Sequence, residues 1–268
     1  MSVSPSIGFS SLAEAYESVL VEPLFRPWAG ELLQRAELKA GDRVLDIACG
    51  TGIVARVVRQ RLGDGARVVG VDASEPMLAV AKRVAPDIEW RAGNAMALPV
   101  DVGEQFDVVT CQQGLQFFPD RPAAAREMRR ALADGGRLAI ATWRPLEDIP
   151  FFGDLHALAE QHLGPVVDQR HAFGVPSEIE TLLRDAGFND VRVDTLTRTI
   201  RLSDPATFFQ LNANAIVGMS QAAKTMDEVD RAKVTATIAA ESSQLLGRYG
   251  EGAGLVFELS TNAAIARA

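Results

Sequence analysis

Apolar segments alternate with amphipathic segments through the first half of the chain. In the amphipathic segments hydrophobic residues recur three and four positions apart, as at Val54, Val57 and Val58, which is the spacing of a helix with one buried face. Strands that alternate with helices favour a mainly parallel sheet with helices on both faces. The five expected strands are the β-branched runs at residues 43–49, 67–73, 88–93, 106–111 and 137–143.

The second half of the chain changes this spacing. Residues 191–202 and 254–267 each have the pattern of a strand, without a return to the earlier alternation between them, so we expect an antiparallel pair at one edge of the sheet. Residues 10–37 and 203–250 have helical patterns, and we predict that they form cap elements. The chain shows no internal repeat and no low-complexity linker, so we expect one domain across residues 1–268.

Composition and charge narrow the choice of partners. The 268 residues include 27 Lys and Arg against 35 Asp and Glu, a net charge of -8, so we expect no nucleic-acid partner, which would need a basic surface. No run approaches the ~18 apolar residues of a membrane span, and no basic segment leads into an apolar one at the N-terminus. We therefore expect a cytoplasmic protein with no membrane partner. Cys49 and Cys111 form no C-x-x-C pair, which argues against a metal site.

The segment LDIACGTGIVAR, residues 45–56, joins a predicted strand to a predicted helix through two glycines, Gly50 and Gly52. Such a turn at the carboxyl end of a parallel strand is a ligand site in open α/β sheets, because it exposes backbone amides at a helix N-terminus. Asp72, twenty residues beyond Gly52, ends the next predicted strand, where a carboxylate can accept both hydroxyls of a ribose. We therefore expect a nucleoside ligand. With Ala55, the glycines also satisfy the G-x-G-x-x-[GA] dinucleotide pattern.

The position of Asp46 helps to decide between a dinucleotide and another nucleoside as the ligand. It lies four residues before Gly50, where a carboxylate would oppose a pyrophosphate but would tolerate a cationic ligand. This favours a positively charged nucleoside.

Four ordered motifs, VLDIACGTG, VVGVDAS, RAGNAMALP and FDVVTCQQGLQFFPD, resemble those of class I S-adenosylmethionine-dependent methyltransferases. The similarity covers residues 40–145 and is greatest to the small-molecule branch, which includes the ubiquinone and menaquinone C-methyltransferases and the type 11 methyltransferases. The resemblance implies a Rossmann-like α/β fold with a seven-stranded, mainly parallel sheet whose last strand is antiparallel. It also implies that the protein is an enzyme and that its cofactor is S-adenosylmethionine.

The resemblance implies roles for individual residues. Asp46, Gly50 and Gly52 would bind the methionine end of the cofactor, and Asp72 would hold its ribose. The family more often has Asp at the position of Asn94, so this chain gives up a charge-assisted hydrogen bond there. The other implied cofactor contacts are Ala73 and Met77 beside the adenine, Asn94 and Ala95 at its edge, Gln112 and Gln113 beside the sulfonium, Phe117 as a wall, and Tyr16 as an N-terminal cover.

The acceptor half of the site is marked by fewer residues. His171 precedes a predicted helix on a loop expected near the carboxyl edge of the sheet, and we hypothesise that its imidazole removes a proton from the acceptor, with a surface or capping role as the alternative. Trp143, at the end of a strand, is expected to line the acceptor site. Phenylalanines occur in adjacent pairs at residues 117–118, 151–152 and 208–209, and in each pair we expect at most one ring to face a pocket.

Methyl transfer from a sulfonium mainly requires alignment of the acceptor, so the lack of an obvious catalytic acid and base pair is compatible with it. The apolar content of residues 203–250 favours a small hydrophobic or aromatic acceptor, attacked through oxygen, nitrogen or carbon. Two other functions remain open at this point. One is a cofactor-retaining cyclase or binding module without methyl transfer, and the other is an NAD-dependent oxidoreductase. We expect a monomer or a homodimer.

Overall fold

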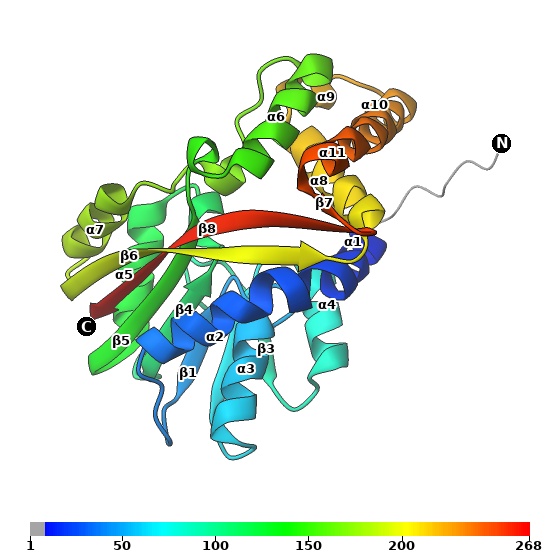
Figure 1. The fold of residues 1–268 in the computed structure, drawn as a ribbon. Coiled ribbons are helices and arrows are strands. Elements are labelled where there is room, and N and C mark those ends of the chain that lie inside the picture. Colours follow the sequence, from blue (N-terminus) through cyan, green and yellow to red (C-terminus); the bar gives the residue numbers. More distant parts are fainter. Residues whose placement is uncertain (1–8) are drawn as a thin grey trace.

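One mixed sheet forms the centre of the computed structural model, which describes residues 9–268 (Figure 1). The strands are β1 (Val44–Ile47), β2 (Val68–Asp72), β3 (Glu89–Ala92), β4 (Phe106–Gln112), β5 (Leu132–Trp143), β6 (Asn189–Leu202), β7 (Gly250–Glu251) and β8 (Gly254–Arg267). Strands β1 to β5 follow the five β-branched runs of the sequence.

The strand order is β3-β2-β1-β4-β5-β8-β6, with the short β7 paired to β8. Strand β1 pairs in parallel with β2 and β4, and the β2–β3 and β4–β5 pairs are also parallel. Strand β8 runs antiparallel to both β5 and β6. The predicted fold class is therefore confirmed, including the antiparallel last strand. Strand β8 lies between β5 and β6, so one edge of the sheet is formed by β6. The chain leaves β6, forms helices α8 to α11 (residues 205–249), and then returns as β8 between the two earlier strands.

Helices precede, connect and cover these strands. Several helices are capped by an Asp or Ser side chain at the N-terminus: the Ser74 hydroxyl accepts from the N–H of Met77, and the Asp204 carboxylate accepts from the N–H of Thr207 at 3.0 Å. The principal helices are α1 (Phe9–Ala15), the π-helix η1 (Tyr16–Phe25), α2 (Arg26–Arg35), α3 (Ile53–Leu62), α4 (Glu75–Val84), α5 (Arg121–Ala131), α6 (Pro150–Leu163), α7 (Pro176–Asp185), α8 (Pro205–Met219), α9 (Gln221–Lys224), α10 (Glu228–Glu241) and α11 (Leu246–Tyr249).

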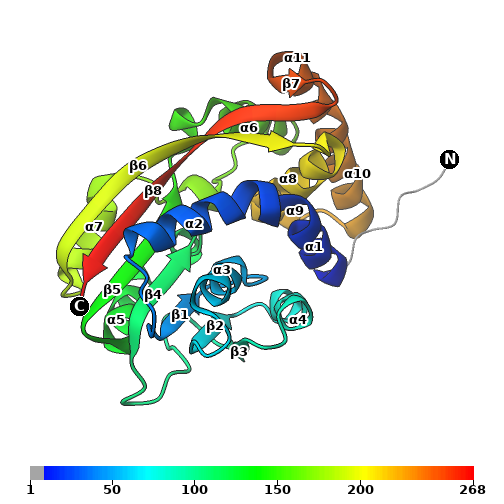
Figure 2. The same ribbon diagram turned by 60° about the horizontal axis from the view of Figure 1, so that its bottom comes forward.

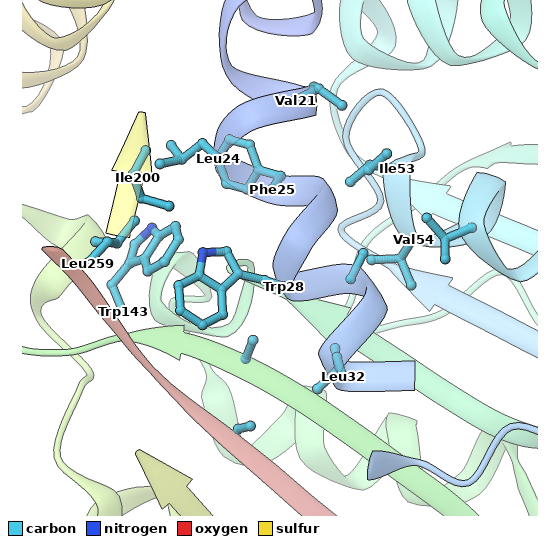
Figure 3. Packing of buried hydrophobic residues seen from close by; sticks show 14 of the residues in the cluster. Val21, Leu24, Phe25, Trp28, Leu32, Ile53, Val54, Trp143, Ile200 and Leu259 are labelled. Atoms are coloured by element: carbon cyan, nitrogen blue, oxygen red, sulfur yellow. The ribbon is translucent and has the colours of Figure 1, made fainter. Parts of the chain in front are cut away.

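The two faces of the sheet carry separate hydrophobic cores, because side chains alternate between faces along each strand. In β1, Val44 packs with η1, α2 and α3 on one face, whereas Leu45 and Ile47 pack with α5 and α7 on the other. Figure 3 shows the first core, where Trp28 of α2 lies against Trp143 with ring centroids 6.2 Å apart. This packing fixes the N-terminal helices across the sheet.

A helical layer covers the carboxyl end of the sheet on one side. Strands β6 and β8 run side by side over most of their length and extend toward α8, α10 and α11 (Figures 1 and 2). Helices α6, α8 and α10 share a third hydrophobic cluster, and α1 contacts both α4 and α8. Among the helices of residues 9–268, none is long and apolar enough to cross a membrane.

An aromatic cluster joins this helical layer to the sheet. The ring of Phe151 in α6 is stacked on that of Phe257 in β8, with centroids 4.1 Å apart, and also contacts Phe208 in α8 and Tyr249 in α11. Phe151 is 1% exposed. Its side chain therefore ties four elements together.

Replacing Phe151 by Ala should lower the free energy of unfolding by about 3 to 5 kcal/mol, because it removes a buried ring and leaves a cavity. Urea denaturation followed by circular dichroism measures this change. The matched control is Val229→Ala on the exposed face of α10, which should change stability by less than about 0.5 kcal/mol. Equal effects of the two substitutions would contradict this assignment of the cluster.

Candidate cofactor and acceptor site

A cavity of about 360 Å³ lies at the carboxyl ends of β1, β4 and β5. Its other lining residues come from the N-terminal helices, from α3, α4, α6 and α8, and from short helical turns after β4 and before α7, so segments far apart in the sequence meet there. Nine residues singled out from the sequence line this one cavity: Tyr16, Asp46, Gly50, Met77, Gln112, Gln113, Phe117, Trp143 and His171.

The other five do not line the cavity. Asp72 is hydrogen-bonded to a residue that lines the cavity: its carboxylate accepts from the backbone N–H of Gly50 at 2.7 Å. It also accepts from the backbone N–H of Ser74 at 2.8 Å. Asn94 is exposed, and its side-chain oxygen accepts from the N–H of Met96 at 2.9 Å. The remaining three of the five are Gly52, Ala73 and Ala95, of which Ala95 is buried in the core under α5.

The two glycines of the turn do different work. Gly50 has φ +56°, and a Cβ there would meet nothing within 4 Å, so its backbone borders open space. Gly52 has φ +88°, and a Cβ there would lie 2.2 Å from the ring of Trp90. The missing side chain of Gly52 therefore makes room for a core tryptophan, and the expected contact of its backbone with a ligand stays a prediction.

Two other residues of the cavity also adopt a left-handed backbone. Ala48 has φ 53° and Gln113 has φ 57°, a conformation that costs a residue with a Cβ roughly 1 to 3 kcal/mol and that clusters at functional sites. Each follows the end of a strand, β1 or β4. Gln113 lines the cavity, and its side-chain amide donates to the Thr261 hydroxyl at 2.9 Å.

Asp46 is buried inside β1 and faces the cavity. Its carboxylate accepts from the Thr110 hydroxyl at 2.8 Å and from the Ala55 N–H at 3.3 Å. Burial outweighs these bonds and raises the pKa of Asp46 to about 7. A bound cation would lower this pKa again, so the position favours a positively charged ligand.

Gln112 presents an unused acceptor. Its side-chain amide donates to the backbone oxygen of Phe25 at 3.1 Å, which ties β4 to the end of η1. Its Oε1 atom is buried and has no hydrogen-bond partner among the described residues. A buried acceptor left unpaired costs about 1 to 3 kcal/mol, so a ligand that brings a donor or a positive charge would relieve it.

The Tyr16 side chain comes from η1 and also lines the cavity. Its ring packs against that of Phe25 with centroids 5.1 Å apart. Burial and the carboxylates of Asp72 and Glu17 raise the pKa of Tyr16, so its hydroxyl stays protonated and can donate. The N-terminal segment therefore contributes a polar atom to the cavity as well as apolar cover.

His171 lies on η4 (Gln169–His171) and also lines the cavity. Its Nδ1 atom lies 2.8 Å from the backbone oxygen of Arg144, and because a carbonyl can only accept, Nδ1 must carry the proton. The other ring nitrogen, Nε2, then has a free lone pair. Burial lowers the pKa of His171 to about 4, so the ring is neutral and able to accept near neutral pH.

Each phenylalanine pair sends one ring to the cavity, as expected. Phe117, Phe152 and Phe208 line it, whereas their neighbours Phe118, Phe151 and Phe209 pack elsewhere. The reason is geometric, since adjacent residues point in different directions along a helix.

Sequence reasoning missed the polar residues beside His171. Arg170 and Asn212 line the cavity and are hydrogen-bonded to each other at 2.8 Å. Arg170 adjoins His171 in the sequence, which is a signal that could have been used. Asn212 comes from the middle of α8, and its position at the cavity depends on how that helix packs.

Comparisons with known proteins agree with this geometry. A family model described as a methyltransferase domain matches residues 44–136. Nocamycin O-methyltransferase of Saccharothrix syringae is 32% identical over 233 residues, which cover 78% of this chain and 78% of that protein. Demethylmenaquinone methyltransferase of Thermus thermophilus is 34% identical over 191 residues, which cover 63% of this chain and 84% of that protein.

A solved structure shares the fold. Phosphoethanolamine N-methyltransferase 2 of Haemonchus contortus, in complex with S-adenosyl-L-methionine, has a TM-score of 0.59 to this chain at 19% identity, over 97% of this chain and 57% of that one. The cofactor of the present protein is S-adenosylmethionine, and the protein is an enzyme that uses it for methyl transfer. By its sequence relatives and its fold, the chain belongs to the class I S-adenosylmethionine-dependent methyltransferases.

Proposed function

We propose that this enzyme transfers a methyl group from S-adenosylmethionine to a small hydrophobic or aromatic acceptor. The observation that carries the proposal is one cavity whose lining includes Gly50 and Asp46 as well as His171 and the rings of Phe152 and Phe208. Donor and acceptor would meet there with little water between them. Exclusion of water and alignment are the main requirements of this reaction.

The residues at the donor end fit the cofactor. Asp46 and the unpaired Oε1 of Gln112 are acceptors that suit a cationic ligand, and Gly50 leaves space beside the backbone. Among the described residues of the lining, Arg170 is the single Arg or Lys, and it is already paired. A pyrophosphate would therefore lack a free cation, which argues against the NAD-dependent alternative.

We assign the donor end as follows. Gly50 and Asp46 bind the methionine part, Asp72 holds the ribose through the turn that it braces, and Met77 packs beside the adenine. Gln112 and Gln113 lie near the sulfur, while Tyr16 and Phe117 cover the site. For Asn94, Ala95, Ala73 and Gly52, which do not line the cavity, the proposal is weaker contact or a purely structural role. When bound, the cofactor supplies a methyl group already activated by its positively charged sulfur.

The acceptor end needs only one polar contact from the protein. Trp143, Phe152 and Phe208 form apolar walls that hold a flat ring. His171 Nε2 accepts the proton that a hydroxyl or similar nucleophile of the acceptor loses as it attacks the methyl group. The backbone carbonyl of Arg144 accepts from Nδ1–H of His171 and so stabilises the imidazole ring. With a pKa of about 4, His171 is a weak base, so it orients and receives the proton rather than ionising the acceptor beforehand.

Asp72→Ala should weaken binding of S-adenosylhomocysteine at least about tenfold, because it removes the brace of the Gly50 turn and a charged acceptor. Isothermal titration calorimetry of both proteins measures this change. Asp101→Ala, at an exposed position outside the cavity, is the matched control and should bind like the wild type. No binding of S-adenosylhomocysteine to the wild type would overturn the proposed function.

Asp46→Asn should stabilise the folded protein at pH 8. The pKa of Asp46 rises from 3.8 to about 7 on folding, so the folded state binds more protons between those values and stability falls as pH rises through that window. Asn cannot ionise, and we expect a gain of about 2 kcal/mol at pH 8 and a smaller one at pH 5.

Urea unfolding at the two pH values tests this prediction. The same variant should bind S-adenosylhomocysteine roughly tenfold more weakly, because a charged partner is lost. A variant that is less stable than the wild type at pH 8, with binding unchanged, would contradict both parts.

His171→Gln should lower the single-turnover rate by about 10² or more at saturating acceptor, since general-base contributions are usually 10² to 10⁴. The acceptor is first identified by mass spectrometry of a metabolite extract incubated with methyl-deuterated cofactor. The wild-type rate should not change with pH near neutrality through the titration of His171. It should fall only as the pH approaches about 4, where His171 becomes protonated.

His162→Gln is the control for this experiment, because His162 lies on α6 outside the cavity and pairs with Glu241. A loss of less than threefold in His171→Gln would remove the proton-accepting role. Tight cofactor binding with no labelled product from any extract would favour the cyclase or binding-module alternative.

A further inference from the structure

The acceptor end of the cavity contains a masked positive charge. Arg170 reaches the lining from the short helix η4 (Gln169–His171). Its guanidinium donates to Asp168 through Nε to Oδ1 at 2.9 Å and through Nη2 to Oδ2 at 2.6 Å, a two-pronged pair. The Asp168 side chain is completely buried behind it, with 0% exposure. The pair faces the acceptor side of the cavity with no net charge.

The rest of the guanidinium is also held by the protein. Nη1 of Arg170 donates to the side-chain oxygen of Asn212 at 2.8 Å, and Asn212 donates in turn to the backbone oxygen of Phe208 at 3.0 Å. The guanidinium carbon lies 5.7 Å from the centre of the Phe152 ring. These contacts orient Arg170 along the wall rather than toward a ligand.

Asp168 stays ionised in this setting. Burial alone would raise its pKa, but hydrogen bonds and the charge of Arg170 lower it. An ionised carboxylate against a guanidinium cancels the attraction that Arg170 would otherwise exert on an anion. A ligand anion at this end would lose its hydration and find no free cation among the described residues of the lining.

Two unpaired polar atoms of the lining are acceptors, while the Tyr16 hydroxyl, which can donate, comes from the N-terminal helix η1. Nε2 of His171 has a free lone pair because Nδ1 carries the proton, and Oε1 of Gln112 has no partner among the described residues. Unpaired acceptors require a ligand that brings hydrogen-bond donors. They offer nothing to a second negative charge.

We propose that Asp168 is a specificity-determining residue: by neutralising Arg170 in the cavity wall, it makes the site select uncharged aromatic hydroxy compounds and reject those with a permanent carboxylate, sulfonate or phosphate. This inference rests on the proposed function, because it concerns the acceptor of that reaction. Its test uses ligand binding alone, so the two can fail separately.

The test compares two dyes that share an aryl skeleton and differ by one charge. N-phenylnaphthylamine is uncharged, and anilinonaphthalene sulfonate carries a sulfonate. Fluorescence titrations are run with and without saturating S-adenosylhomocysteine. The wild type should bind the uncharged dye at least about tenfold more tightly, because the sulfonate is desolvated without a free cation.

Asp168→Asn is the decisive variant. It leaves Arg170 charged and unpaired at the wall, so the preference for the uncharged dye should fall at least about tenfold, through a gain in sulfonate binding. Asp168→Asn combined with Arg170→Gln removes both charges and should restore the preference. A purely structural role for Asp168 predicts instead that the variant loses both dyes in the same proportion.

Two further variants keep the inference testable. Ala215→Phe fills the cavity from α8 and should abolish the binding of both dyes, which locates the signal. If thermal melts show that Asp168→Asn does not fold, Asn214→Lys adds an unpaired cation to the same lining and should also gain sulfonate binding. Equal affinity of the wild type for both dyes, or an unchanged ratio in a folded Asp168→Asn or Asn214→Lys variant, would overturn the proposal.

Discussion

The site depends on the turn after β1, and this turn is held by the hydrogen bond of 2.7 Å from the Gly50 N–H to the Asp72 carboxylate. This bond ties the turn after β1 to the end of β2 and holds the backbone in the left-handed conformation that Gly50 adopts with φ +56°. Helix α3 then begins directly after Gly52, whose missing side chain admits the Trp90 ring. Core packing and the shape of the donor end are therefore set by the same turn.

Burial by the covering helices shifts two titratable groups in opposite directions. It raises the pKa of Asp46 to about 7 and lowers that of His171 to about 4, because an apolar surrounding disfavours the charged form of an acid and of a base alike. Near neutral pH, His171 is therefore uncharged, while Asp46 is poised to ionise when a cation arrives. One physical cause thus places in the same cavity an acid that a cation would help to ionise and a base that is uncharged.

The covering helices serve both stability and function. Phe152 and Phe208 line the cavity, while their neighbours Phe151 and Phe209 are fully or almost fully buried in the adjoining core. A change in packing at this aromatic cluster would move the acceptor walls as well. The polar pair of Arg170 and Asp168 lies at the same boundary, and it presents a neutral surface because its two charges are matched.

The sequence by itself determined the strands and their order, and placed Asp46, Gly50, Trp143 and His171 near the carboxyl edge of the sheet, because hydrophobic periodicity and the positions just after strands are local features. The five other residues that line the cavity, Tyr16, Met77, Gln112, Gln113 and Phe117, were implied by the resemblance of the motifs to a known family. Parallel strands bring their carboxyl ends to one edge, so Asp46, Gly50 and Trp143 could be placed together without coordinates. Only the tertiary structure decided which of the expected residues do not line the cavity and which unexpected ones do. Gly52 turned to the core, Asn94 stayed exposed, and Asn212 joined Arg170 from a helix 42 residues away. Burial, helix packing and the pairing of Arg170 with Asp168 arise from contacts between segments, and no local pattern of residues encodes them.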